Sequence, residues 1–219
     1  MPLEYEYRYS NDYYNHDEIM KKLEANGAKK HGNWLFRVQV FTNPNITSNP
    51  YIRVRDEGYR TTLTYKSNVG KEFTQEDEII IDNFDTGRKI LLGLGCVPRY
   101  YYEKIREIWH IGNTEICWDT NPGRYDIMEV EAKSKKTLEK TIELLGLKGV
   151  PHDNFTDVGL YTESFGIVIS KNVDLTFGTV KKILGPSVTK NKKEFNKLVD
   201  TQNKMLALVK KINNKITKK

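Results

Sequence analysis

The sequence has little cysteine and histidine and no long apolar run, and each absence excludes a class of protein. Cys96 and Cys117 are the two cysteines among 219 residues, and their spacing fits neither a metal-ligand motif nor a redox motif. The four histidines are scattered, so we expect no zinc site and no cysteine–histidine nucleophile, and we expect both thiols to be reduced. No stretch reaches the roughly 18 to 20 apolar residues of a membrane helix, and the first residues do not show the basic, apolar and small-residue order of a signal peptide. We therefore expect a soluble, cytoplasmic protein without a membrane span.

The net charge of +6 is divided unevenly along the chain. Residues 171–219 contain 13 Lys against three acidic residues, a balance of +10, which leaves −4 for residues 1–170. The basic character therefore belongs to one end of the chain. We predict a main domain over residues 1–170 and a basic extension over residues 171–219.

Apolar residues recur in the extension at steps of three and four, which predicts an amphipathic helix over about residues 192–217 with lysines on its other face. A hinge is expected before it, at residues 185–187 and Asn191. We expect this helix to pack on the main domain. Two alternatives stay open, a basic arm that contacts nucleic acid or an acidic partner and a helix that lies on a membrane surface.

The main domain is rich in aromatic residues and in period-two patterns, which favours β-structure. The chain has 13 Tyr, eight Phe and three Trp, whose large apolar bodies suit half-buried sheets. Eight segments alternate like strands, and short turns between neighbours imply antiparallel pairing: 3–9, 34–42, 51–56, 60–67, 73–82, 99–110, 114–119 and 125–132. Three helices are predicted, two between these strands at 16–26 and 85–94 and one after the last strand at 137–145. The fold class is α+β, mostly β.

Charged residues on these strands lie two apart, so they share one face of their strand. Glu4, Glu6 and Arg8 form such a row, with Tyr5 and Tyr7 on the opposite face. The spacing recurs on four further strands, in the pairs Arg53 and Arg55, Glu76 and Glu78, Lys104 and Arg106, and Glu129 and Glu131. A solvated face explains any one strand, but five rows that are each mostly of one sign repel and destabilise the sheet unless ions of opposite charge bind there.

Closing the sheet into a barrel would bring the acidic and basic rows together in one lumen. Glutamate oxygens suit Mg²⁺ or Mn²⁺, whereas rows of Arg and Lys suit phosphate. Tyr5, Tyr7 and Tyr9 would then point outward and pack beneath helices. The rows together indicate a site for a metal ion and a polyphosphate.

At this point the motifs resemble those of the CYTH superfamily, the triphosphate tunnel metalloenzymes. Glu4-Tyr-Glu6-Tyr-Arg8 is similar to the family's ExExK strand. The later motifs follow in the same order as in the family: Arg53-Val-Arg55 (RxR), Leu63-Thr-Tyr-Lys66 (LTxK), Glu76-Asp-Glu78 (ExE), Lys104-Ile-Arg106 (KxR), and Asp119 followed by Glu129-Val-Glu131 (D…ExE). The resemblance implies an eight-stranded antiparallel closed barrel with helices outside, Mg²⁺ or Mn²⁺ as cofactor and a triphosphate-containing small molecule as substrate.

The resemblance also implies roles for individual residues. The implied metal ligands are Glu4, Glu6, Asp119, Glu129 and Glu131. The implied phosphate-binding residues are Arg8, Arg53, Arg55, Lys66, Lys104 and Arg106, and Glu76 and Glu78 form a further acidic pair. Glu4, Glu6, Arg8, Lys66 and Arg106 are the implied catalytic residues. The chain departs from the family pattern at Arg8, where Lys is commoner, at Thr74, where Arg is frequent, and at Tyr125, where Gly is frequent.

The resemblance leaves the reaction open, because hydrolysis and cyclisation use the same kind of site. We favour metal-assisted phosphohydrolysis of an inorganic, thiamine or nucleoside triphosphate, which needs only water as the nucleophile. The alternatives are a class IV adenylyl cyclase, which forms cyclic AMP and pyrophosphate, and an RNA 5′-triphosphatase or a non-catalytic binder of polyphosphate or RNA. A monomer and a homodimer are both compatible with the sequence.

Overall fold

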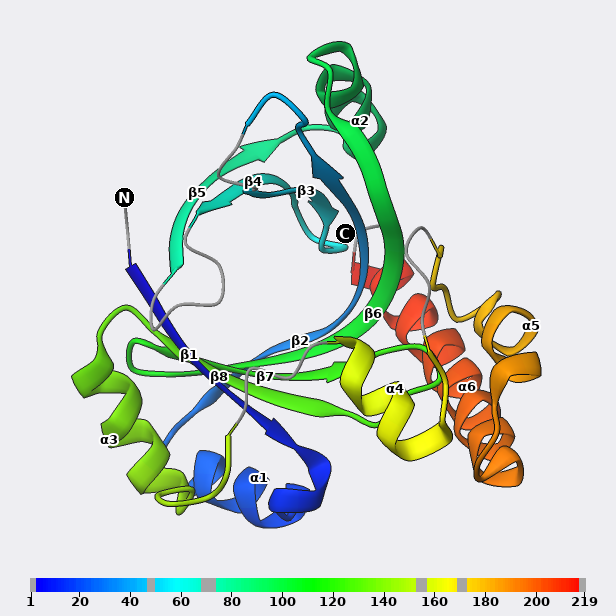
Figure 1. The fold of residues 1–219 in the computed structure, drawn as a ribbon. Coiled ribbons are helices and arrows are strands. Elements are labelled where there is room, and N and C mark those ends of the chain that lie inside the picture. Colours follow the sequence, from blue (N-terminus) through cyan, green and yellow to red (C-terminus); the bar gives the residue numbers. More distant parts are fainter. Residues whose placement is uncertain (1–2, 47–49, 68–73, 153–156, 169–172, 217–219) are drawn as a thin grey trace.

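The computed structural model describes residues 3–46, 50–67, 74–152, 157–168 and 173–216. Its eight strands form one closed antiparallel barrel in the order β1-β5-β4-β3-β2-β6-β7-β8 (Figure 1), which confirms the predicted fold. The strands are β1 (Leu3–Ser10), β2 (Lys29–Thr42), β3 (Tyr51–Asp56), β4 (Thr61–Ser67), β5 (Thr74–Ile81), β6 (Val97–Ile111), β7 (Thr114–Thr120) and β8 (Ile127–Ala132).

The barrel closes between its first and fifth strands through a short seam. Only two residue pairs join β1 to β5 among the described residues, Leu3 with Gln75 and Glu4 with Thr74. The remainder of β1 pairs with β8 from Tyr5 to Ser10. Glu4 therefore lies at the seam, where the two halves of the sheet meet.

Two helices cover the outer face of β1, β7 and β8, as Figure 1 shows. These are α1 (His16–Ala25) and α3 (Lys135–Leu145), each with a side-chain cap at its N-terminus, from Asn15 and Ser134 respectively. Tyr9 is fully buried in the core that these helices share with the sheet, and Tyr5 and Tyr7 pack against that core. The tyrosine face of β1 therefore points outward beneath helices, as predicted.

A third helix, α2 (Phe84–Gly93), packs on the outside of β3, β4 and β6. Its buried residues Phe84 and Leu91 join a core cluster with Phe41, Ile52 and Val54. The helix begins one residue before the expected Asp85, because the Asn83 side chain accepts a hydrogen bond from Thr86 N and so caps the helix at that point.

The chain beyond α3 forms α4 (Asp157–Phe165), α5 (Val180–Leu184), a 3₁₀ turn at Gly185–Ser187 and the long helix α6 (Lys192–Ile216). Figure 1 shows α6 along the exterior of the barrel, beside α4 and α5. Its Val209 is buried against Ile105 of β6 and Phe177. The apolar stripe of α6 thus packs on the barrel wall, in the way its periodicity favours. The predicted domain boundary at residue 170 and the predicted helix end at residue 217 lie outside the described residues.

The segment before α5 pairs with the edge of β6 that β7 does not cover. Leu175 donates a backbone hydrogen bond to Tyr101 O (2.9 Å) and accepts one from Glu103 N (2.9 Å). The β7 strand pairs with β6 only from Ile105 onward. Residues after the third helix therefore complete the barrel wall next to the cavity.

Most strand boundaries differ from the sequence-based expectation by one or two residues, and two of the differences have identifiable reasons. The β2 strand begins at Lys29 instead of residue 34, because a register shift between Lys30 and Gly32 lets the strand continue past Gly32 with φ of 145°. The β8 strand begins at Ile127 instead of residue 125, because the Tyr125 hydroxyl donates a hydrogen bond to Glu194 of α6 (2.5 Å) and leaves the sheet. Phe73, expected at the start of β5, lies outside the described residues.

Two further expectations concern the cysteines and the absence of membrane helices. Cys96 and Cys117 are both free and buried, as expected. Within the described part of the chain, no helix has the length and apolar composition needed to cross a membrane.

Candidate active site

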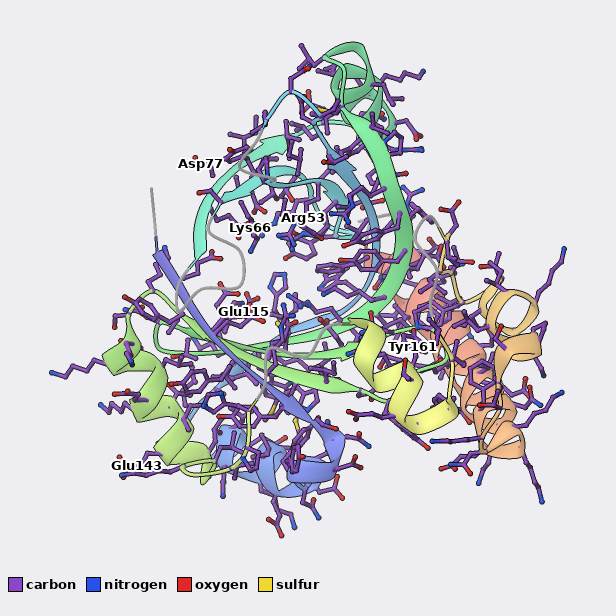
Figure 2. All side chains as sticks on the ribbon, viewed as in Figure 1. Arg53, Lys66, Asp77, Glu115, Glu143 and Tyr161 are labelled. Carbon is purple, nitrogen blue, oxygen red and sulfur yellow. The ribbon has the colours of Figure 1, made fainter. Side chains whose placement is uncertain are left out.

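All thirteen residues singled out in the charged strands line one cavity of about 340 Å³ inside the barrel. Figure 2 shows Arg53, Lys66 and Glu115 pointing into the barrel, while Asp77, between the inward-facing Glu76 and Glu78, points away from it. This division follows from strand geometry, because successive side chains alternate between the two faces of a sheet. The structure therefore brings together every residue that the sequence-based hypothesis placed at the site.

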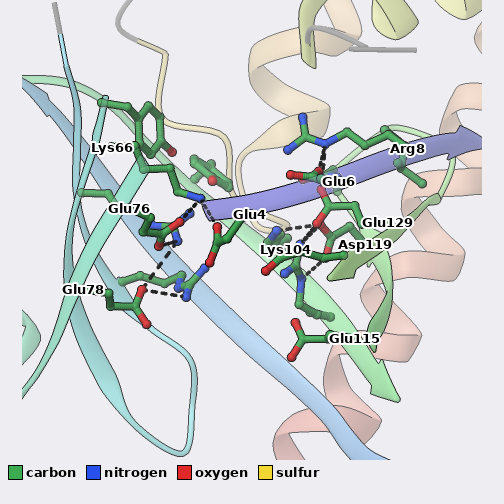
Figure 3. A pocket seen from close by; sticks show the side chains of 18 of the residues that line it. Glu4, Glu6, Arg8, Lys66, Glu76, Glu78, Lys104, Glu115, Asp119 and Glu129 are labelled. Atoms are coloured by element: carbon green, nitrogen blue, oxygen red, sulfur yellow. Dashed lines mark hydrogen bonds and ion pairs between the residues drawn. The ribbon is translucent and has the colours of Figure 1, made fainter. Parts of the chain in front are cut away.

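One side of the cavity is built from β1, β6, β7 and β8, and its acids and bases neutralise one another (Figure 3). Asp119 accepts hydrogen bonds from Lys104 Nζ (2.6 Å) and from Arg106 Nε and Nη2 (2.6 and 2.5 Å). Glu129 forms ion pairs with Arg106 and with Arg8. Burial opposes ionisation of Glu129, but these cations outweigh it and hold its pKa well below the usual range.

The opposite side is built from β3, β4 and β5. Arg53 Nη2 contacts Glu76 (3.3 Å), and Arg55 Nη2 contacts Glu78 (3.2 Å). Lys66 pairs with Glu76 and lies 3.5 Å from Glu4. These ion pairs hold the basic side chains pointing inward, where an anionic ligand would meet them.

Between the two sides lies a group of four neighbouring carboxylates, which we call the acid cluster: Glu4, Glu6, Glu115 and Glu131. Glu4 pairs with Lys66 and Glu6 with Arg8, so acids still outnumber their basic partners here. Glu131 faces Glu6 on β1 and Glu115 on β7 in the strand register. Burial, and then repulsion by Glu4, Glu6 and Glu115, raises the pKa of Glu131 to about 8. Among the described residues Glu131 forms no ion pair or side-chain hydrogen bond.

Glu4 shows the same tendency at the seam of the barrel. Burial and a side-chain hydrogen bond with Glu76 raise the pKa of Glu4 to about 7, although Lys66 acts in the opposite direction. A carboxylate whose pKa is raised by burial and by a neighbouring acid favours the approach of a further positive ion.

The acid cluster offers only carboxylate oxygens, which are the ligands that Mg²⁺ and Mn²⁺ prefer. As the side chains stand, no three His, Cys, Asp or Glu residues of the described chain converge closely enough to hold a metal ion. A divalent cation would therefore have to draw the flexible glutamates of neighbouring strands together. The excess of acids over bases in the cluster supports such a role, whereas Asp119 and Glu129 are each held by buried cations.

Comparison with known families agrees with the geometry of this cavity. Residues 4–145 match the CYTH domain. The chain belongs to the CYTH family. A comparison with curated proteins gives no significant match.

Solved structures share the fold at low sequence identity. A Pyrococcus horikoshii protein is 22% identical with a TM-score of 0.58, and the alignment covers 73% of this chain and 99% of that one. A Vibrio parahaemolyticus protein described as a putative adenylate cyclase is 15% identical with a TM-score of 0.62, with 74% and 98% covered. A conserved hypothetical protein of Pyrococcus furiosus is 17% identical with a TM-score of 0.58, with 72% and 99% covered. The CYTH match of this chain ends at residue 145, so α4, α5 and α6 lie beyond it.

Seven further residues line the cavity that sequence reasoning did not select: Tyr51, Arg60, Tyr100, Tyr102, Glu115, Asn121 and Ile127. Extending the period-two rows of this CYTH barrel would have found several of them. Tyr51 precedes Arg53 and Arg55 by steps of two, and Tyr100 and Tyr102 lead in the same way to Lys104. Glu115 stands four residues before Asp119 on β7, on the same face. Arg60 is in the turn after β3 and has no such signal.

Phe36 of β2, which is 1% exposed, packs against three of the basic residues. Arg55, Lys104 and Arg106 each lie over its ring, at 5.5, 5.8 and 5.7 Å from the ring centre. The negative face of the ring attracts cations, so Phe36 stabilises three charges that would otherwise repel one another.

Proposed function

We propose that this CYTH protein hydrolyses a triphosphate substrate in a reaction that depends on a divalent metal ion. The supporting observation is the charge inventory of the cavity, in which seven basic and eight acidic side chains give a formal lining charge of −1. A triphosphate brings roughly four further negative charges, and a lining that is already slightly negative does not balance them. Binding of the substrate therefore requires added cations, and the acid cluster is where they would bind.

Two sets of residues have distinct tasks in this proposal. Arg53, Arg55 and Lys66 contact phosphate oxygens from one side, and Arg8, Lys104 and Arg106 contact them from the other. Glu4, Glu6 and Glu131 hold the metal ion, with Glu115 next to them. In the absence of substrate, carboxylates pair with the basic side chains and hold them in position. Substrate oxygens then replace these carboxylates, so the basic side chains need little rearrangement when the substrate binds.

A bound Mg²⁺ or Mn²⁺ ion would supply electrophilic assistance to the phosphoryl group. The chain itself orients the reactants. The basic residues neutralise the charge that spreads over the phosphoryl oxygens, and a carboxylate of the acid cluster orients the attacking water. Asp119 and Glu129, which the family resemblance gives as further ligands, must first release Lys104 and Arg106 to reach a metal ion.

An adenylyl cyclase is the second candidate, because a structure that shares this fold is described as a putative adenylate cyclase. The two reactions differ in the nucleophile, which is water in hydrolysis and the ribose 3′-hydroxyl in cyclisation. Tyr51, Tyr100 and Tyr102 line the cavity and give a ring-bearing substrate aromatic surface to contact in either reaction.

The test incubates purified protein with tripolyphosphate, thiamine triphosphate or ATP, with Mg²⁺ or Mn²⁺ or with EDTA. Phosphate, pyrophosphate and cyclic AMP are assayed separately. Metal-dependent release of phosphate is expected. Pyrophosphate and cyclic AMP formed from ATP in equal amounts would favour the cyclase. Absence of turnover on all three substrates, or turnover unaffected by EDTA, would contradict the proposal.

A further inference from the structure

The outward face of α6 carries a straight row of lysines, which we call the lysine row: Lys193, Lys197, Lys204, Lys211 and Lys215. All five are exposed. Steps of four and seven residues return to the same side of an α-helix, so the five side chains share one face. At a rise of about 1.5 Å per residue, the row is about 33 Å long.

The opposite face of α6 is fixed to the barrel, which makes the row a rigid feature. Phe195, Val199 and Val209 are at most 3% exposed. Gln202, also buried, accepts a hydrogen bond from Gly123 N (2.7 Å) and donates to Asn121 O and Arg124 O (2.9 and 2.8 Å). These contacts fix which side of α6 faces solvent.

The positive charge of the lysine row is not neutralised by the chain. In the part of the chain that the structure describes, none of the five lysines forms an ion pair or a side-chain hydrogen bond. The two acidic residues of α6 are engaged elsewhere, since Glu194 accepts from Tyr125 and Asp200 pairs with Lys181 (3.2 Å). A single-sign row of this kind repels itself and gains free energy when a polyanion covers it.

We propose that the lysine row binds the phosphodiester backbone of a nucleic acid. Lysines are point charges that neutralise phosphates without reading the base sequence, and a straight row matches a linear polyanion better than the scattered acids of a folded protein. A bilayer is a poorer partner, because the apolar stripe of α6 is already used against the barrel. The exposed apolar side chains on the solvent side are few, chiefly Leu208 and Ile212, at 62% and 51% exposure.

The C-terminal part of α6 packs against the turn between β3 and β4 through the face opposite the lysine row. A Cβ atom added at Gly58 in that turn would lie 3.8 Å from the Asn213 amide nitrogen of α6. The same turn region carries Arg60, which lines the cavity. The packed face of α6 therefore contacts the barrel near the cavity, and the lysine row faces away from it.

The test measures binding of a fluorescent 20-nucleotide RNA with a 5′-hydroxyl end by anisotropy at several salt concentrations. A DNA of the same sequence distinguishes RNA from DNA as the source of the backbone. The variant Lys204→Glu/Lys211→Glu should lower the affinity at least tenfold and make the slope of log K against log salt shallower by about 1.4, because two phosphate contacts are lost. The 5′-hydroxyl end keeps this test separate from triphosphate turnover, which the variant should retain.

The matched control is Lys136→Glu/Lys140→Glu on α3, where two exposed lysines lie four residues apart. It changes the net charge by the same amount, and its affinity should stay within about threefold of the unmodified protein. Equal losses in the two variants would overturn the proposal, since net charge alone would then explain binding. Failure of the unmodified protein to bind either nucleic acid, or binding only to phosphatidylserine vesicles, would also overturn it.

Discussion

Glu131 lies directly across from Glu6 on the neighbouring strand, and no basic side chain of the described residues pairs with it. Two carboxylates in this register repel, and burial raises the cost of ionising Glu131 further. The facing carboxylates of Glu6 and Glu131 therefore lower the stability of the fold at neutral pH. Such strain is common where binding of a ligand relieves it.

Glu131→Gln should separate stability from metal binding. Without metal at pH 8, the free energy of unfolding of the variant should be higher by about 1 to 3 kcal/mol than that of the unmodified protein. The reason is that the substitution removes a charge that the fold disfavours. Added Mn²⁺ should raise the melting temperature of the unmodified protein and have little effect on that of the variant. Metal-dependent turnover should fall at least a hundredfold.

Glu139→Gln on the exposed side of α3 is the matched control for this prediction. It makes the same chemical change without touching the cavity, so it should leave the melting temperature, the Mn²⁺ response and turnover unchanged. An equal Mn²⁺ response in Glu131→Gln and the unmodified protein would show that Glu131 holds no metal.

The stability of the metal-free protein should fall as the pH rises from about 5 to about 8. The folded-state pKa values of Glu4 and Glu131 are raised to about 7 and about 8, above the value of 4.5 for an unperturbed glutamate. Between these pH values the folded protein keeps protons on Glu4 and Glu131 that the unfolded chain releases. The contribution of these two groups to stability is therefore fully present below pH 4.5 and is lost as the pH rises through their folded-state pKa values. Carboxylates with a lowered pKa, such as Glu129, make stability depend on pH only below about pH 5.

Urea denaturation at pH 5, 6, 7 and 8 in EDTA measures this dependence. Glu131→Gln should flatten the decline relative to the unmodified protein, and a saturating concentration of Mn²⁺ should offset it. Parallel curves for the two proteins would show that Glu131 is not the group that titrates.

Asp119→Asn should be strongly destabilising, because it leaves Lys104 and Arg106 buried without their shared anion. Asp119 receives three of their hydrogen bonds, all between 2.5 and 2.6 Å. Removing one partner of a buried ion pair costs about 3 to 5 kcal/mol. Tripolyphosphate should restore part of the lost stability, since it brings anionic oxygens to the same two cations.

The control for Asp119→Asn is Asp85→Asn, which breaks an exposed pair with Arg88 at the start of α2. A surface pair of this kind contributes less than about 1 kcal/mol. Denaturation with and without tripolyphosphate compares the two variants. Equal destabilisation in both would mean that the cavity is open to bulk water and its ion pairs are screened.

The alternation of charge along the strands was enough to predict which side chains face the lumen, because the period of a strand is a local property. It could not predict which acid pairs with which base. Glu131 and Asp119 are both acids on inward faces, yet one repels its neighbours and the other is held by Lys104 and Arg106. That difference depends on strand register, which joins residues far apart in sequence.

The two short helices beyond the third helix escaped prediction for a different reason. The α4 segment is nine residues long and includes Gly159 and Thr162, which weaken any helical pattern. Tyr161 and Phe165 stabilise it instead by packing against the α6 residues Phe195 and Val199. Tertiary contacts of this kind are not visible in a local window of sequence.

Gln202→Leu should loosen the turn between β7 and β8 while α6 stays helical. Leucine keeps the approximate volume but leaves Gly123 N and the carbonyls of Asn121 and Arg124 without the Gln202 amide, which costs about 1 to 3 kcal/mol. Hydrogen exchange at the Gly123 amide should accelerate at least tenfold. Because Asn121 lines the cavity, KM for the triphosphate should rise more than kcat falls.

Gln202→Glu serves as the companion variant. It keeps the oxygen that accepts from Gly123 N and loses the donor, so Gly123 should stay protected from exchange. Loss of protection in both variants would assign the effect to general loosening of α6.

Ending the chain after Leu184 should unfold or aggregate the protein, which tests whether residues 1–170 form an independent domain. The cut removes Phe195, which is 0% exposed and packs edge-on against Phe165, with ring centres 5.2 Å apart. Gly123 has φ of 68° and lies so close that an added Cβ would be 2.8 Å from the Phe195 ring, so the barrel turn is shaped around α6. A chain ending after Val209 keeps these contacts and loses the last ten residues, five of them lysines, so it should remain folded and active. Gel filtration and binding of a hydrophobic dye compare the two truncations. A soluble, cooperative and active protein ending at Leu184 would show that the barrel folds alone and that α6 is an accessory element.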